Sequence, residues 1–168
     1  AGMSGEDKKL TEEEFKQLLA DVIAKGNAER GEQIFRRADL SCLKCHSVSK
    51  AGGEVGPDLS PIGASSPVDY LVRSILYPNQ AVKEAYQTYV IVTIEGKIIR
   101  GIIVDRNEER VILKDANGKE IVIPVDDIDD EAEGGSLMPQ GLTKFLTRDE
   151  LLDLVKYLSV LGKPGPYA

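Results

Sequence analysis

The sequence predicts a mostly helical fold that is interrupted by an antiparallel β insert of about four strands. Two capping boxes, Thr11-Glu12-Glu13-Glu14 and Thr147-Arg148-Asp149-Glu150, each precede apolar residues at helical spacing. From about residue 87 to 125 the chain is instead rich in β-branched residues, and Asn117-Gly118 is a strong two-residue hairpin signal. A length of 168 residues suits one domain with such an insert.

The helices can be placed in order from their start and stop signals. The first capping box begins an amphipathic helix, and Gly26 ends it. Asn27 caps a second helix, in which Gly31 would permit the close approach of the helix that follows Thr147. A third helix begins at Ser66-Pro67-Val68-Asp69 and stops before Pro78.

These signals divide the chain into segments. We expect a disordered terminus over 1–10, an additional amphipathic helix over 11–26, the main domain over 27–162 with its β insert at about 87–125, and a tail over 163–168. Within the insert, the expected strands are 87–95, 97–105, 110–115 and 119–125.

The charge balance restricts the partners. The net charge is −7 and the pI is about 4.9, so binding to nucleic acid or to an anionic membrane surface has little electrostatic support. No apolar run is long enough to span a bilayer. The densest acidic stretch, 126–133, is interpreted as a solvated acidic loop, with partner steering or calcium binding as alternatives.

One pentapeptide carries the chemistry of the chain. Cys42-Leu43-Lys44-Cys45-His46 contains both cysteines and the sole histidine, and Cys-x-x-Cys-His is the attachment signature for c-type haem. In a helical turn, side chains at i, i+3 and i+4 share one face. Cys42 and Cys45 can then form thioethers with one haem, while His46 is its proximal iron ligand.

Three other interpretations of the pentapeptide are weaker. A dithiol redox centre belongs near a βαβ pattern, and no strand is expected before Cys42. A structural zinc site needs four ligands, and no cysteine or histidine remains to complete one. A chance pair of buried or disulfide-bonded cysteines is the third alternative.

A single histidine excludes bis-histidine ligation within one chain. The second axial ligand is then a methionine, a lysine, a less usual group, or absent. Met3 precedes the motif in the expected disordered terminus, whereas Met138 lies in Gly134-Gly135-Ser136-Leu137-Met138-Pro139, just ahead of the last helix. Met138 is therefore the better candidate, although most methionines simply fill cores.

A set of motifs carries a family resemblance. In chain order they are Gly31-x-x-x-Phe35, Cys42-x-x-Cys45-His46, Gly56-Pro57-Asp58-Leu59, Tyr77-Pro78-Asn79, Ser136-Leu137-Met138-Pro139-Gln140-Gly141-Leu142 and a terminal helix through Tyr157-Leu158. This order resembles class I c-type cytochromes. With a β insert that starts near Tyr86, it looks like the haem-binding domain of Pirellula/Verrucomicrobium type.

The resemblance covers about residues 27 to 162 and implies a mostly α cytochrome c-like fold with one covalent haem c. It implies that Cys42 and Cys45 hold the haem, and that His46 and Met138 are the proximal and distal ligands. Pro57 would shape the proximal loop, near a carbonyl that accepts the His46 Nδ1 proton, and Leu59 would contact the haem. The helix over residues 12–25 departs from the family pattern, and three roles are open for it: packing on the domain, linking to a lost domain, or mediating self-association.

The function implied is a monohaem cytochrome that carries single electrons between redox protein partners, without enzymatic activity of its own. Domains of this kind often accompany dehydrogenases, so a fused or docked dehydrogenase is an expected electron donor. The alternatives are a haem sensor or haem enzyme with an open or displaceable distal site, and an interaction module that uses the β insert. Because covalent haem attachment normally occurs outside the cytoplasm, we expect a periplasmic or otherwise extracytoplasmic protein whose precursor carries an export signal that is not in this sequence.

Overall fold

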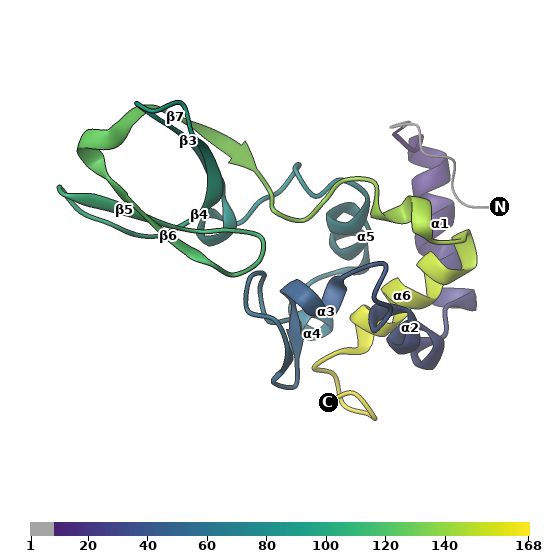
Figure 1. Ribbon diagram of the computed structural model, residues 1–168. Coiled ribbons are helices and arrows are strands. Elements are labelled where there is room, and N and C mark those ends of the chain that lie inside the picture. Colours follow the sequence, from purple (N-terminus) through teal and green to yellow (C-terminus); the bar gives the residue numbers. More distant parts are fainter. Residues whose placement is uncertain (1–8) are drawn as a thin grey trace.

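The protein consists of a helical part and a β unit that lie side by side (Figure 1). The structure is a computed structural model that describes residues 9–168. Of these residues, 39% are helical and 23% are in strands. Figure 1 shows the chain leaving the helices after α5, forming the whole sheet, and returning to the helices through the segment after β7.

The helical part contains residues from both ends of the chain. Its α-helices are α1 (Glu12–Lys25), α2 (Ala28–Phe35), α3 (Cys42–Cys45), α4 (Ile62–Ser65), α5 (Val68–Leu76) and α6 (Arg148–Val160). Both predicted capping boxes are present, at Thr11 for α1 and at Thr147 for α6. A small hairpin of β1 (Ser47–Val48) and β2 (Ala51–Gly52) follows α3, and short 3₁₀ turns lie at Glu84–Tyr86 and Leu142–Phe145.

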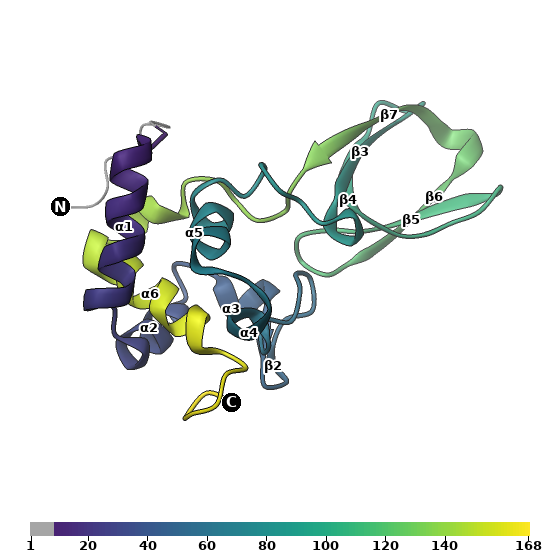
Figure 2. The ribbon, with the colours of Figure 1, turned by 180° about the vertical axis from the view of Figure 1, so that it is seen from behind.

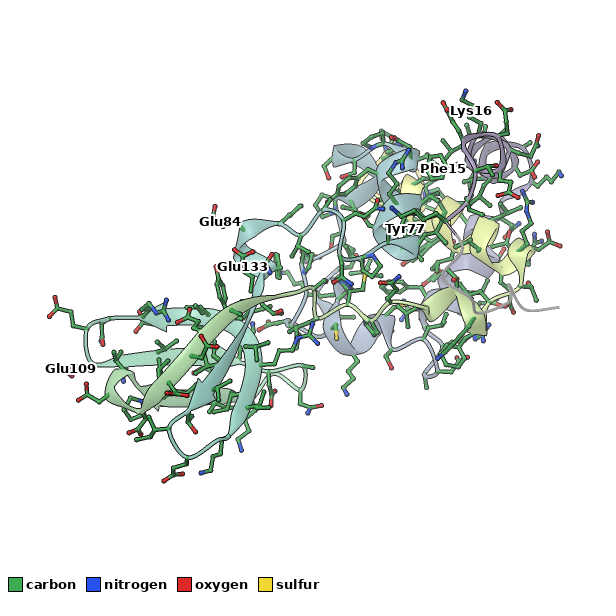
Figure 3. All side chains as sticks on the ribbon, turned by 90° about the horizontal axis from the view of Figure 1, so that it is seen from above. Phe15, Lys16, Tyr77, Glu84, Glu109 and Glu133 are labelled. Atoms are coloured by element: carbon green, nitrogen blue, oxygen red, sulfur yellow. The ribbon has the colours of Figure 1, made fainter. Side chains whose placement is uncertain are left out.

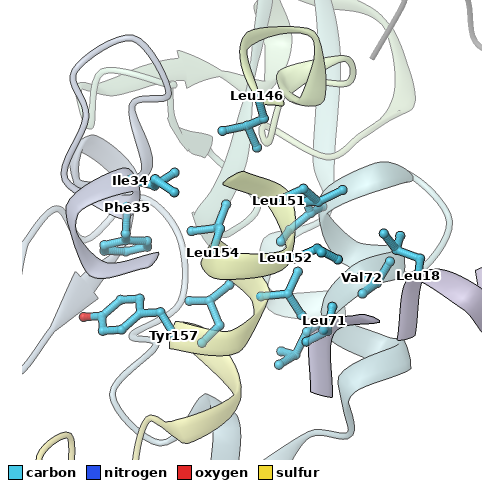
Figure 4. Packing of buried hydrophobic residues seen from close by; sticks show 14 of the residues in the cluster. Leu18, Ile34, Phe35, Leu71, Val72, Leu146, Leu151, Leu152, Leu154 and Tyr157 are labelled. Carbon is cyan, nitrogen blue, oxygen red and sulfur yellow. The ribbon is translucent and has the colours of Figure 1, made fainter. Parts of the chain in front are cut away.

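Helix α6 is the centre of the helical core (Figure 4). Leu151, Leu152 and Val155 are at most 1% exposed, and each fully buried aliphatic side chain contributes about 1.5–3 kcal/mol. Gly31 lets α2 cross α6 in direct contact: a Cβ there would lie 1.9 Å from the Asp153 carbonyl oxygen. The prediction that these two helices cross is therefore confirmed.

The additional N-terminal helix belongs to the same core. Phe15, Leu18 and Val22 of α1 are buried within it, whereas Lys16 lies on the outer side of α1 (Figure 3). Just before α1, the backbone N–H of Leu10 donates to the Tyr77 hydroxyl at 2.9 Å. Of the three roles expected for this helix, packing on the domain is the one observed. Of the disordered terminus expected over 1–10, residues 1–8, with Met3, lie outside the described residues.

The β unit, residues 88–135, is a five-stranded antiparallel sheet with the strand order β6-β5-β4-β3-β7. Its strands are β3 (Thr88–Thr93), β4 (Ile98–Arg106), β5 (Arg110–Lys114), β6 (Glu120–Pro124) and β7 (Ile128–Gly135). The sheet is strongly curled, as seen from both sides in Figures 1 and 2. Inside the curl lies a core of its own, formed by Ile91, Val111, Leu113 and Ile123.

The four predicted strands are confirmed, but the sheet has a fifth that was not predicted. The stretch 126–133, interpreted as a solvated acidic loop, forms a 3₁₀ turn (Val125–Asp127) and most of β7. The sequence of this stretch is typical of a loop because β7 is rich in acidic residues and lacks the alternation of apolar and polar residues that marks most strands. Such a sequence suits an edge strand, which pairs through its backbone on one side and keeps charges in water on the other.

The predicted fold class, a mostly α cytochrome c-like fold with a four-stranded insert, is wrong. The molecule is a mixed fold in which the five-stranded sheet stands beside the helices. The reason is physical: once β7 closes one edge, the strands can enclose a separate hydrophobic core, so the sheet is a second structural part rather than an appendage.

Candidate functional site

The first four residues of the Cys-x-x-Cys-His pentapeptide form the short helix α3, and His46 is its C-cap. The backbone N–H of His46 donates to the Cys42 carbonyl at 2.8 Å and closes the turn. Ser41, just before it, has a φ of 58°, so the chain enters the turn from the left-handed region. Cys42, Cys45 and His46 are all partly buried, and both cysteines are free thiols.

A glycine-rich loop packs against this turn. The backbone N–H groups of Gly53 and Gly56 donate to the carbonyls of Leu43 and Cys45, at 2.8 and 2.7 Å. A Cβ on Gly56 would lie 2.7 Å from Cε1 and 2.9 Å from Nδ1 of His46. Only a glycine at position 56 therefore leaves room for the imidazole in its present position.

The His46 imidazole is oriented by one hydrogen bond. Its Nδ1 lies 2.8 Å from the carbonyl oxygen of Pro57. A carbonyl can only accept, so Nδ1 carries the proton and Nε2 keeps a free lone pair, the form in which histidine ligates metals. Burial lowers the pKa of His46 below its ordinary value, against the opposing effect of the Pro57 hydrogen bond, and this favours the neutral ring.

A cavity of about 530 Å³ brings the predicted site residues together. Cys42, Cys45, His46, Pro57, Leu59 and Met138 all line it. Pockets that bury cofactor-sized ligands measure about 300–1,000 Å³. The rest of the wall is mainly apolar and includes Phe35, Leu40, Ile75, Leu154 and Leu158.

Leu59 and Met138 enter this wall from different segments. The Leu59 backbone N–H donates to the Ser47 carbonyl at 2.8 Å, which ties the loop after Pro57 to the hairpin after α3. Met138 lies between β7 and the 3₁₀ turn at Leu142–Phe145, and its N–H donates to the Ser136 hydroxyl at 3.1 Å. The fold thus brings a thioether to the same cavity as the only histidine.

The cavity residues fit a c-type haem on several independent counts. The two thiols and the imidazole come from one turn. The hydrogen bond to Pro57 holds the His46 proton on Nδ1, which leaves Nε2 available to an iron ion, and Gly56 leaves space for the imidazole. Apolar walls of this kind suit a flat apolar macrocycle and exclude water from it.

The β unit also contributes to the cavity, which was not predicted from the sequence. Ile102 of β4 and Ala116 of the β5–β6 turn line it. Next to them, Lys44 Nζ donates to Asn117 Oδ1 at 3.2 Å, and Lys114 Nζ donates to the Glu54 carbonyl at 3.1 Å. The β5–β6 turn and the loop after α3 approach each other in both Figures 1 and 2.

A signal for this contact does exist in β4. Its sequence Ile98-Ile99-Arg100-Gly101-Ile102-Ile103-Val104 places apolar residues on both faces of the strand. Ile99 and Ile103 pack on the inner core of the β unit, while Ile102 on the other face is 7% exposed. Apolar residues on both faces indicate that both faces are at least partly covered.

The structure bears on the other interpretations of the two cysteines. Burial, with a smaller effect of Cys45, raises the pKa of the Cys42 thiol to about 11. Redox dithiols instead depend on a thiol whose pKa is lowered towards neutrality. Within residues 9–168, no three His, Cys, Asp or Glu side chains come together as a set of metal ligands.

Comparison with known proteins identifies no relative from which a function could be inferred. No protein-family model matches the chain, and a search of the curated proteins finds no similar sequence. None of the helices within residues 9–168 combines the length and the hydropathy needed to cross a bilayer.

Proposed function

We propose that the protein is a monohaem c-type electron carrier. The observation that supports this most is the single apolar cavity that Cys42, Cys45, His46 and Met138 share. When bound, haem iron supplies a one-electron couple between its ferric and ferrous states.

Each residue has a proposed task in this function. Cys42 and Cys45 tether the haem covalently, and His46 presents the unprotonated Nε2 to the iron while the Pro57 carbonyl holds the ring. Met138 would supply its thioether as the second protein ligand, and two protein ligands favour electron transfer over the binding of a small molecule. The apolar wall keeps water out, and Leu59 is part of that wall.

The redox partners are proposed to be proteins, with a fused or docked dehydrogenase as one donor, and the protein itself is proposed to have no catalytic activity. The proposed location is periplasmic or otherwise extracytoplasmic, because covalent haem attachment normally takes place there.

Covalent attachment is tested by a pyridine haemochrome spectrum of the protein expressed with a haem-attachment system. The wild type should give the spectrum of haem with both vinyl groups saturated, and the double variant Cys42→Ala, Cys45→Ala should contain no covalent haem. Ser41→Ala, which changes an exposed neighbour of the turn, serves as a control and should keep the haem. Covalent haem in the double variant would overturn the proposal.

The distal ligand is tested with Met138→Ala. The ferric wild type should show the near-red band of a methionine-to-iron bond, and the variant should lose it and have a lower reduction potential. An unchanged band and potential would show that another group is the ligand. Rapid binding of carbon monoxide by untreated ferrous wild type would instead favour a haem sensor with an open distal site.

A further inference from the structure

The segment that carries Met138 is held by side chains from the β unit. We name residues 134–138 the Met138 loop. The Arg100 guanidinium, on β4, donates through one terminal nitrogen to the Gly134 carbonyl at 2.7 Å and to the Ser136 carbonyl at 3.0 Å. The Thr88 hydroxyl of β3 donates to the Gly135 carbonyl at 2.9 Å. Successive carbonyls of the loop are thus bound by two neighbouring strands.

The helical part holds the same loop from the other side. Asn79, three residues after the end of α5, accepts the Ser136 N–H through Oδ1 at 3.0 Å. Gly135 has a φ of +78°, and a Cβ there would lie 2.7 Å from that same Oδ1. The loop is therefore fitted closely between Asn79 and the sheet, directly ahead of Met138.

This arrangement matters because of the nature of the thioether. Methionine has a flexible, unbranched side chain, so a Met–iron bond must compensate for the loss of its conformational freedom. A loop that is already ordered reduces that cost, as preorganisation does for any ligand. Residues 136–138 of the Met138 loop belong to no helix or strand, so their conformation is not fixed by backbone pairing.

We infer that Arg100 is a positioning residue for Met138, and that the β unit thereby sets the strength of the distal ligand. This inference rests on the proposed function. Arginine suits the task because its planar, permanently charged group holds its N–H donors in a fixed geometry, in which one terminal nitrogen reaches both carbonyls. A lysine ammonium also has several donors, but it is a compact point charge on a more flexible stem.

The test compares Arg100→Met with Arg106→Met in the haem-loaded protein. Arg106 is a matched control because it lies on the same strand and forms an ion pair with Glu131 of β7, away from the Met138 loop. Arg106→Met should keep the near-red band and the potential of the wild type. Arg100→Met should lose most of the band, have a lower potential and bind carbon monoxide at least about tenfold faster in the ferrous state, because a poorly held thioether leaves the iron more often.

Two further variants make the result specific. Arg100→Lys keeps the charge and N–H donors but loses the fixed planar geometry of the guanidinium, so its band should be intermediate between those of the wild type and Arg100→Met. Asn79→Ala removes the acceptor on the helical side without altering the sheet, and it should weaken the band in the same direction.

Hydrogen exchange provides a readout that does not depend on haem spectroscopy. The Ser136 amide should exchange about fivefold faster in Arg100→Met than in the wild type, whereas amides of β5 should be unchanged. A wild type with the band, together with an Arg100→Met variant of unchanged band, potential and exchange, overturns this inference and leaves the proposed function standing. A wild type with covalent haem but without the band overturns the assignment of Met138 and the inference with it.

Discussion

At the scale of single residues, the candidate site depends on an absent side chain as much as on present ones. His46 can keep its hydrogen bond to Pro57 only because residue 56 has no Cβ. Gly31 is a second position where the absence of a Cβ is required, because α2 crosses α6 there in direct contact. Both glycines serve close approach, although neither needs the positive φ that only glycine adopts easily.

We predict that Gly56→Ala disturbs the site without unfolding the protein. The new Cβ would lie 2.7 Å from the imidazole, so either the ring turns or the loop retreats, and the bond to Pro57 weakens. The haem-loaded variant should have a lower reduction potential and a smaller low-spin ferric fraction, both measurable by absorption spectroscopy with redox titration.

Gly96→Ala is the control for this change. Gly96 has a φ of +80° and no atom within 4 Å of an added Cβ, so the variant introduces backbone strain at a distant hairpin turn. It should lower stability by about 1 kcal/mol and leave the spectrum unchanged. Identical spectra for Gly56→Ala and the wild type would contradict the close fit described here.

At the scale of elements, an ionic cluster joins α1 to α6. Asp21 of α1 is 6% exposed and lies 3.1 Å from Lys25 Nζ and 2.7 Å from an Arg148 guanidinium nitrogen at the start of α6. Hydrogen bonds from Lys25 and then Arg148 lower the pKa of the Asp21 carboxyl below its ordinary value. The N-terminal helix α1 is thus bound to the last helix by charge as well as by apolar packing.

We predict that Asp21→Asn lowers stability in a pH-dependent way. Because the pKa of Asp21 is lower in the folded than in the unfolded chain, its carboxylate stabilises the fold above about pH 4 and loses this effect as the pH falls through the folded-state pKa. The urea midpoint of the variant should therefore be lower than that of the wild type at pH 7, with a smaller difference at pH 3.

The matched control is Glu12→Gln on the same helix. Among residues 9–168, the ion pair of Glu12 is the one with Lys16, and both side chains are well exposed, so the loss of the Glu12 charge should change the midpoint little. An Asp21→Asn difference that is the same at both pH values would contradict the electrostatic explanation.

At the scale of the whole molecule, the protein has two hydrophobic cores joined across the cavity. The helical core surrounds α6, and the core of the β unit lies inside the curled sheet. The contacts that join the two parts include the hydrogen bonds from Lys44 to Asn117 and from Lys114 to Glu54. Glu109 marks the end of the β unit that lies away from the helices (Figure 3).

We predict that Leu113→Ala opens the β unit before the helical part. Leu113 is fully buried in the smaller core, so its truncation should cost about 2–5 kcal/mol. Hydrogen exchange should accelerate across β4 and β5 but remain slow in α6, as expected for separate local unfolding units. Val122→Ala, at a site that is 56% exposed on β6, should have little effect. Equal acceleration in α6 would show that the two cores unfold as one.

Much of the secondary structure could be predicted because its causes are local. The capping boxes at Thr11 and Thr147 and the turn at Asn117-Gly118 each depend on residues within a few positions of one another. The α3 turn is equally local, so the grouping of Cys42, Cys45 and His46 on one short segment follows from spacing alone.

The remaining features are products of contacts between residues far apart in the chain. Strand β7 exists because β3 offers its backbone, not because acidic residues prefer strands, and this is why the fold class was predicted wrongly. Likewise, no local pattern brings Met138 to the cavity of His46, or Arg100 to the carbonyls beside Met138. The Cys42, Cys45 and His46 side of the candidate site was determined by the sequence alone, because those residues lie within one turn. The Met138 side was decided only in the tertiary structure, because Met138 and the sheet residue Arg100 that binds its loop are brought there by contacts between distant parts of the chain.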